Sequence, residues 1–137
     1  MPFISAVLIA AALLMGLPAN AAVAKQPLRE VPEITDGIFT IVVANEIRRK
    51  CDDINGRLVH GVLEIRRLKA RANALGYTDD EIRAVLESRA EKARMIERGR
   101  TYMAGLGLDY DKPGDLCRLG RLEIENNSAI GALLRAN

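Results

Sequence analysis

The residues with the clearest capacity for chemistry lie in LDYDKPGDLCRLG, residues 108–120. This stretch starts like a calcium-binding loop, because acidic residues and a glycine follow one another closely: Asp109, Asp111, Gly114 and Asp115. An EF-hand loop that starts at Asp109 needs an oxygen ligand at its fifth position and a glutamate at its twelfth, where the sequence has Pro113 and Gly120. We therefore favour a turn that begins a helix near Pro113, with Asp115 at or near its N-terminus, over a structural calcium site.

His60 is the second candidate, and it is the only histidine in the chain. A histidine base needs an orienting partner, and no spacing in the sequence proposes one. Beyond residue 24 the serines are Ser88 and Ser128, and neither lies in a G-x-S-x-G context. Zinc would need more histidines and free cysteines than the chain has. We expect no enzyme, no cofactor and no metal, with an enzyme centred on His60 as the alternative.

The first 24 residues contain no charged side chain. An apolar run from about residue 6 to residue 17 precedes Pro18 and two small-x-small sites that end at Ala21 and Ala24. This layout predicts a secretory signal peptide over residues 1–24, cleaved after Ala21 or Ala24, and so a periplasmic protein. The basic start of a signal peptide is missing. A retained membrane anchor is the alternative, since the apolar stretch of residues 3–19 is close to the shortest length that spans a bilayer.

Cys51 and Cys117 are the two cysteines of the chain. In an oxidising compartment a disulfide between them is the default, and a single pair leaves no choice of connectivity. Closing a loop of about 66 residues stabilises a fold by about 4 kcal/mol in the chain-entropy model. A redox pair is the alternative, although no C-x-x-C motif is present to lower a thiolate pKa.

The elements that would position these residues are helices. Residues 25–34 carry two prolines and mixed charges and predict an extended arm. Apolar spacing then predicts a helix capped by Thr35 or Asp36 that ends near Cys51, although its β-branched residues would also suit a strand. Further helices are expected over 57–75, over 78–105 behind a Thr78–Glu81 capping box, from about 113, and behind Ser128. With no convincing strand pair, residues 35–137 predict an all-α domain, a bundle of four or five helices held by one disulfide.

The charges exclude a strong electrostatic field. Twenty basic and 18 acidic residues give a net charge of +2, which argues against nucleic acid binding. The densest basic cluster lies on the predicted second helix: Arg66, Arg67, Lys69 and Arg71. Such a run is usually a solvated helix face, and the alternative is contact with anionic lipid headgroups or an acidic protein surface.

Two stretches, GYTDDEIRAVLESRAEKARM and LCRLGRLEIENNSAIGALLR, resemble a family of small exported bacterial proteins catalogued as a domain of unknown function. The positions that carry the resemblance are Gly76, Tyr77, Cys117, Gly120, Arg121, Glu123, Ile124, Ser128, Ile130, Gly131, Leu133, Leu134 and Arg135. The resemblance covers most of the chain beyond the signal peptide, whose missing basic start departs from the family. It implies no catalytic residues. Through its association with genes for respiratory NADH–quinone oxidoreductase (complex I), it implies an accessory subunit on the periplasmic side of the membrane.

These observations predict a non-enzymatic interaction protein of the periplasm, docked on a membrane complex. The first surface to test is the closing segment, with Gly120, Arg121, Glu123, Ile124, Ile130, Gly131 and Arg135 as partner-binding residues. The alternative is that Gly120 and Gly131 only allow tight packing inside the monomer. A free binding module or holdase-type chaperone with an exposed apolar stripe is the second prediction.

Overall fold

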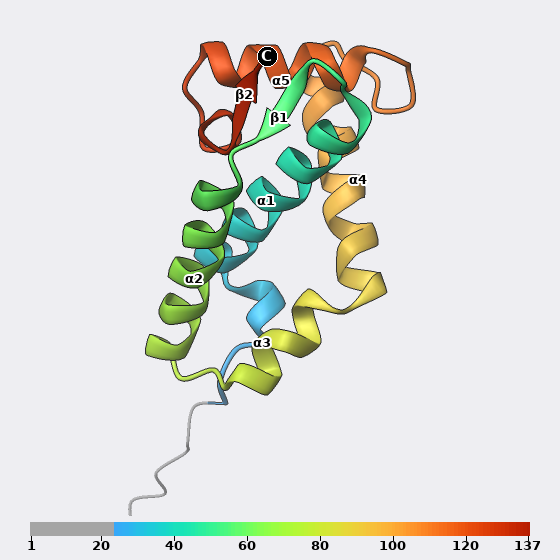
Figure 1. Cartoon of the computed structure of the whole chain (residues 1–137). Coiled ribbons are helices and arrows are strands. Elements are labelled where there is room, and N and C mark those ends of the chain that lie inside the picture. The colour runs from blue at the N-terminus through green and yellow to red at the C-terminus, as the bar shows by residue number, and fades with distance from the viewer. Residues whose placement is uncertain (1–23) are drawn as a thin grey trace, which may run out of the picture.

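The computed structural model describes residues 24–137, so the predicted signal peptide of residues 1–24 lies almost entirely outside the described residues. The described chain forms five α-helices with two 3-10 turns and a two-stranded ribbon (Figure 1). In chain order the elements are η1 Leu28–Glu30, α1 Pro32–Lys50, β1 Ile54–Gly56, α2 Leu58–Ala74, α3 Asp79–Leu86, α4 Arg89–Gly105, α5 Asp115–Glu125, η2 Gly131–Leu133 and β2 Leu134–Ala136. The predicted all-α class with one disulfide is therefore confirmed.

α1 begins earlier than the sequence pattern indicated. Pro32 is its first residue, and Val31 before it is extended, as a residue that precedes proline prefers. Thr35 and Asp36 therefore lie inside the helix rather than at its cap. The arm predicted over residues 25–34 is likewise helical in part, because η1 and the first turn of α1 fall within it.

The helix predicted over residues 78–105 is two helices. The capping box is confirmed, since the Thr78 hydroxyl accepts from the Glu81 backbone and the Glu81 carboxylate accepts from the Thr78 backbone. α3 nevertheless ends at Leu86, and Ser88 starts α4 by accepting a hydrogen bond from the Glu91 backbone at 3.2 Å. A second cap inside the apolar pattern thus breaks the helix.

The end of the chain also differs from expectation. The helix expected behind Ser128 is only the short turn η2, whose N-cap residue is Ile130. The Ser128 hydroxyl accepts a hydrogen bond of 3.0 Å from the backbone N–H of Gly131. β2 then pairs antiparallel with β1, in a register that sets Ile54 opposite Ala136. Asn55 and Gly56 therefore lie in a strand, although no convincing strand pair is expected from the sequence. The helix expected from Pro113 begins at Asp115 behind Gly114, whose φ of 89° suits glycine.

Buried side chains form two clusters. The larger one joins α1, α4, α5 and the ribbon, and its most deeply buried large side chains are Ile47, Ile54, Met103 and Leu119. The smaller one joins η1, α1, α2 and α3: Leu28, Ile34, Leu68, Ala72, Tyr77 and Ile82. We call the region of α5, β1, β2, η2 and the C-terminal half of α1 the disulfide end. We call η1, α2, α3 and the sides of α1 and α4 that face them the cleft end.

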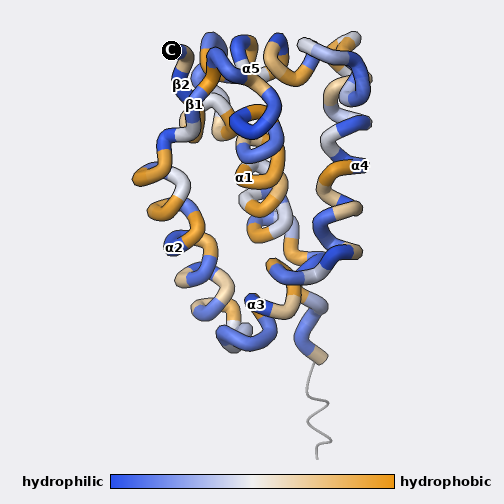
Figure 2. The backbone as a smooth tube through the Cα atoms, turned by 45° about the vertical axis from the view of Figure 1, so that its right-hand side comes forward, coloured by the Kyte–Doolittle hydropathy of each residue, from blue (hydrophilic) through white to orange (hydrophobic). Residues whose placement is uncertain are grey.

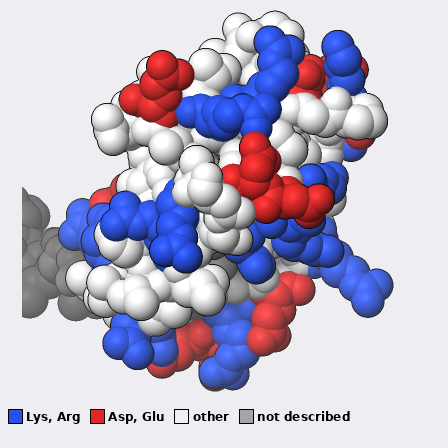
Figure 3. All heavy atoms as spheres, turned by 45° about the horizontal axis from the view of Figure 1, so that its top comes forward, with Lys and Arg blue, Asp and Glu red and all other residues white. Residues whose placement is uncertain are grey.

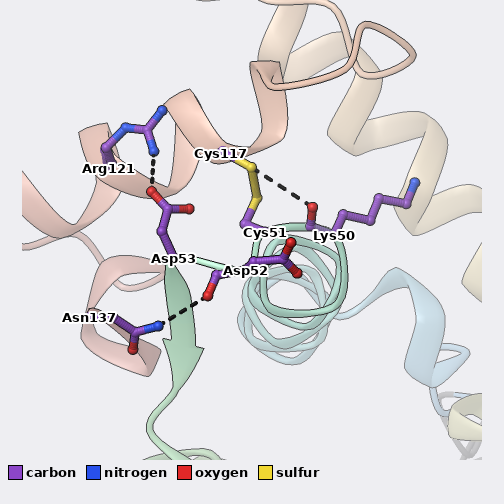
Figure 4. The surroundings of a disulfide bond; sticks show 7 residues. All are labelled: Lys50, Cys51, Asp52, Asp53, Cys117, Arg121 and Asn137. Carbon is purple, nitrogen blue, oxygen red and sulfur yellow. Dashed lines mark hydrogen bonds and ion pairs between the residues drawn. A yellow bond between two sulfur atoms is a disulfide. The ribbon is translucent and has the colours of Figure 1, made fainter.

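The Cys51–Cys117 disulfide is confirmed (Figure 4). It joins the C-terminal end of α1 to α5 with a Cα–Cα distance of 5.5 Å, within the usual range for such a bond. Polar contacts surround it: Arg121 pairs with Asp53 at 2.7 Å, and Asn137 donates to the Asp52 carbonyl at 3.0 Å. Covalent and polar contacts thus hold the C-terminal residues against the end of α1.

Candidate functional site

An apolar cleft of about 370 Å³ lies between α1, α2, α3 and α4. Side chains from all four helices line it, among them Ile38, Ile41, Ile65, Leu68, Val85 and Met95. Its volume lies within the range of about 300–1,000 Å³ that is common for ligand pockets. No motif in the sequence identifies this cleft.

The cleft exists because α2 and α4 both pack on α1 but scarcely touch each other. Figures 1 and 2 show the two helices running along opposite sides of α1, with α3 bridging them at the end away from α5. Close packing of α2 against α1 depends on Gly37, because a Cβ atom there would lie 2.3 Å from a methyl group of Leu68. Because α2 and α4 scarcely touch each other, the side of α1 between them is left partly uncovered.

A second hollow of about 200 Å³ continues the cleft toward the ribbon and shares Ile41 and Ile65 with it. It extends between α1 and α2 as far as Arg48 and Leu58. The α2 residues that line the two hollows occupy one face of the helix, because they fall in groups three or four positions apart: Leu58, Gly61 and Val62, Ile65, Leu68 and Lys69, and Ala72. We call the two hollows together the trough.

α2 exposes much of its apolar surface. On its apolar face Leu68 and Ala72 are buried, whereas Leu58 is 70% exposed, Val62 48% and Ile65 46%. Val59 and Leu63, beside that face, are 72% and 56% exposed. Figure 2 shows hydrophobic residues recurring along the first half of α2. Contiguous exposed apolar side chains of this kind mark interaction sites on soluble proteins.

The rim of the trough is basic. Arg48, Arg57, Lys69 and Lys92 line it, and its one carboxylate, Glu91, pairs with Arg94 at 2.9 Å. Lys69 pairs with Asp79, but Arg48 donates to the neutral side chain of Asn45. Within residues 24–137, Arg48, Arg57 and Lys92 have no carboxylate partner. The trough therefore offers uncompensated positive charge beside an apolar floor.

The predicted basic cluster on α2 is largely compensated. Arg67 pairs with Glu64, Lys69 with Asp79 and Arg71 with Glu33, at 2.6 to 2.9 Å. The hydrogen bond from Arg67 lowers the pKa of Glu64, and the hydrogen bond from Lys69 lowers the pKa of Asp79. Arg66 is exposed and makes no ion pair within residues 24–137. The face that Figure 3 shows likewise mixes basic and acidic side chains.

The two glycines of the closing segment, Gly120 and Gly131, allow close packing inside the fold. A Cβ atom on Gly120 would lie 2.6 Å from Ile54 and 2.7 Å from Ile47. On Gly131 it would lie 2.0 Å from the backbone oxygen of Glu123. Tight internal packing, the alternative considered for these glycines, is what the structure contains.

The other predicted partner-binding residues divide between interior and surface. Glu123 and Ile130 are buried, and Ile124 packs against the larger cluster. The Glu123 carboxylate accepts hydrogen bonds from Tyr102 and Ser128, and it raises the pKa of Tyr102 to about 12. Of the seven predicted residues, Arg121 and Arg135 alone are exposed, and Arg121 is paired with Asp53. Most of this segment cannot contact a partner while the fold is intact.

The acidic loop and His60 also have structural surroundings. Asp115 accepts from the Asp109 backbone at 2.9 Å, and this bond lowers the pKa of Asp115. Arg100 pairs with Asp111. His60 is exposed, and its Nε2 lies 2.8 Å from an Arg57 nitrogen. Within residues 24–137 no group of three or more His, Cys, Asp or Glu residues could hold a metal ion.

The family of the chain follows from comparison with known proteins. A model described as a family of unknown function (DUF5333) matches residues 26–135. The chain belongs to this family. No curated protein and no solved structure matches it.

The family assignment confirms the resemblance seen in the sequence, at the level of a family of unknown function. It supplies no site residues, so for this DUF5333 member the trough stands on its own geometry. One sequence signal pointed to it: Val59 and Leu63 lie beside the apolar face of α2, which makes that helix more apolar than one buried stripe requires. Among residues 24–137, none of the helices is both long and hydrophobic enough to cross a bilayer.

Proposed function

We propose that this DUF5333 member is a non-enzymatic interaction protein of the periplasm that uses the trough to bind a protein partner. The partner is a membrane complex of which this protein is an accessory subunit, and NADH–quinone oxidoreductase (complex I) is our first candidate. The observation that carries the proposal is the trough, with its apolar floor and the exposed aliphatic side chains of α2.

The free energy gained by removing apolar surface from water supports a binding role for the exposed side chains of α2. Covering apolar surface contributes roughly 25 cal/mol for each Å² removed from water. Leu58, Val62 and Ile65 contribute only part of this to folding, because Leu58 is 70% exposed and about half of the other two side chains stays exposed. A partner that covers them would gain that free energy on binding.

Location in the periplasm is supported by two features. The disulfide is of the kind that persists in oxidising compartments, and the first 24 residues have the layout of a signal peptide. The complex I candidate depends on the sequence resemblance alone.

The test is site-specific photo-cross-linking in intact cells. A photoreactive residue replaces Val62 at the trough, and the matched control replaces Lys112, which is exposed near the disulfide end. We expect a membrane-protein adduct from position 62 and none from position 112. Adducts with a complex I subunit support the full proposal, and adducts with another membrane complex overturn that candidate. Equal adducts from both positions, or none, contradict docking through the trough.

A second candidate function is a free holdase-type chaperone, favoured by the exposed Val59 and Leu63 outside the trough. It predicts that the purified protein suppresses aggregation of a reduced, unfolding client such as insulin. Double replacement of Val59 and Leu63 by Ser should remove that effect and leave cross-linking from position 62 unchanged. No suppression at equimolar protein contradicts the chaperone.

A further inference from the structure

We propose that the trough binds a single amphipathic α-helix of the partner, that the polar face of this helix is acidic, and that the helix completes a four-helix arrangement with α1, α2 and α4. The inference rests on the proposed function, because it names the chemistry of the segment that docks there.

The length of the trough suits a short helix. Along α1 the trough extends from Ile34 to Arg48, and along the antiparallel α2 from Ala72 to Leu58. Fourteen residues of helix rise about 21 Å, so a bound helix of about four turns would fill the trough. α2 and α4 both pack on α1 and scarcely touch each other, which leaves a place for a fourth helix between them.

The lining favours a helix over an extended peptide. The cleft part of the trough is walled by helices, whose backbone groups are already hydrogen-bonded, and its lining is mostly aliphatic; Gly56, Arg57 and Leu133 lie at the far end of the second hollow. An extended peptide would bury backbone N–H and C=O groups there without partners, whereas a helix satisfies its own. Side chains at i, i+3, i+4 and i+7 of such a helix would pack against Ile38, Ile41 and Ile65.

The width favours a helix over an acyl chain. A helix with its side chains is about 10–12 Å across. It can therefore cover Leu58 and Val62, at the open end of the trough, as well as Ile65. A single acyl chain in the 370 Å³ cleft would leave Leu58 and Val62 in water.

The rim charge selects the polar face of the bound helix. Arg48, Arg57 and Lys92 lack carboxylate partners in the described chain, so glutamates or aspartates beside the apolar stripe of the bound helix would pair with them. The same charges disfavour a second copy of this chain as the occupant, because a symmetric contact through α2 would bring the two basic rims together.

The experiment uses two synthetic probes and the purified, disulfide-bonded protein. Both are 18-residue helical peptides with the same leucine stripe, and one has glutamate on its polar face where the other has lysine. Calorimetry should show the acidic peptide binding with one-to-one stoichiometry and at least tenfold more tightly than the basic one. The double variant Arg57→Glu with Lys92→Glu should reverse this preference.

A matched pair of neutral variants tests the location. Ile65→Gln in the trough should weaken the acidic peptide at least fivefold, and Leu122→Gln on α5, a site of similar exposure, should leave its affinity unchanged. Both sites are partly exposed, so both variants should fold, and circular dichroism checks this.

Four outcomes overturn the inference: equal affinity for the two peptides, no binding of either, binding of palmitate but of neither peptide, or a dimer that the Ile65 variant abolishes. None of them removes the proposed function, which fails if positions 62 and 112 give equal adducts or if position 62 gives no membrane-protein adduct. The two ideas can thus fail separately.

Discussion

At the disulfide end Ile47, Ile54 and Leu119 are buried almost completely, whereas at the cleft end Leu58, Val62 and Ile65 remain about half exposed or more. Both sets are aliphatic and lie on regular elements, so side-chain type does not explain the difference. The placement of the neighbouring elements does: Ile47, Ile54 and Leu119 pack together in the larger cluster, whereas α2 packs on α1, α3 and η2 but scarcely touches α4. The disulfide end thus buries its aliphatic side chains, whereas the cleft end leaves part of its apolar surface in water, as the proposed docking requires.

The largest expected effect is at the disulfide. Replacing Cys51 and Cys117 together by alanine frees a 66-residue loop in the unfolded chain and should lower the free energy of unfolding by about 4 kcal/mol. Urea titration followed by circular dichroism measures the loss. A loss below about 1 kcal/mol would mean that the noncovalent contacts at this end carry the stability.

Paired truncations sharpen the comparison. Ile47→Ala should cost about 2–5 kcal/mol, because it removes buried methyl groups and leaves a cavity. Ile65→Ala on α2 should cost less than about 1 kcal/mol, since its side chain is about half exposed already. Similar losses for the two variants would contradict the distinction between the two ends.

Replacing glycine by alanine should change the stability of the fold in opposite directions at the two ends. Gly120→Ala places a methyl group against Ile47 and Ile54 and should destabilise by about 1–3 kcal/mol. Gly61→Ala on α2 meets open space and should stabilise by up to about 1 kcal/mol, because alanine is the better helix former. Thermal unfolding of the two variants checks both signs.

The smallest effect is the dependence on pH. Asp115 at the disulfide end and Asp79 at the cleft end both have lowered pKa values, through the hydrogen bond from the Asp109 backbone and the one from Lys69 respectively. Lower pKa values in the folded state mean that both groups stabilise the fold above pH of about 4 and lose that effect as the pH falls further.

High salt should reduce the stabilisation by one of these two carboxylates and not by the other. The Asp79–Lys69 pair is exposed, so about 1 M salt should screen it, whereas the buried Asp115 should keep its contribution. Comparing melting temperatures of Asp79→Asn and Asp115→Asn between pH 3 and 6, at low and high salt, measures this. Equal salt sensitivity of the two variants would contradict it.

Local signals in the sequence predicted much of the fold. The Thr78–Glu81 capping box joins residues three positions apart, so the local sequence specifies its contacts. The chain has two cysteines, so the disulfide has one possible pairing. The sequence does not predict that the helix over residues 78–105 is interrupted at Ser88, because hydrophobic residues continue at helical spacing on both sides of it. Ser88 is nevertheless a residue type that commonly caps a helix. The β1–β2 ribbon was missed because pairing Ile54 with Ala136 depends on the folded chain bringing distant residues together.

The candidate site could not be predicted in the same way. Apolar spacing predicts the helix over residues 57–75, but whether Ile65 on that helix is covered depends on which helices pack beside it. The glycines of residues 120–131 were considered for partner binding because glycine permits close approach, and sequence alone does not say whether the approaching group is internal. Tertiary packing decides both cases.

The most direct test of the account is hydrogen exchange of the disulfide-bonded protein with and without the acidic 18-residue peptide. In the free protein, α5 and the C-terminal half of α1 should exchange slowly and α2 and α3 should exchange faster. The account predicts that the peptide slows exchange in α2, α3 and the facing residues of α1 and leaves α5 unchanged. Slower exchange centred on α5 and the ribbon, or none anywhere, would contradict the claim that the cleft end is the binding surface.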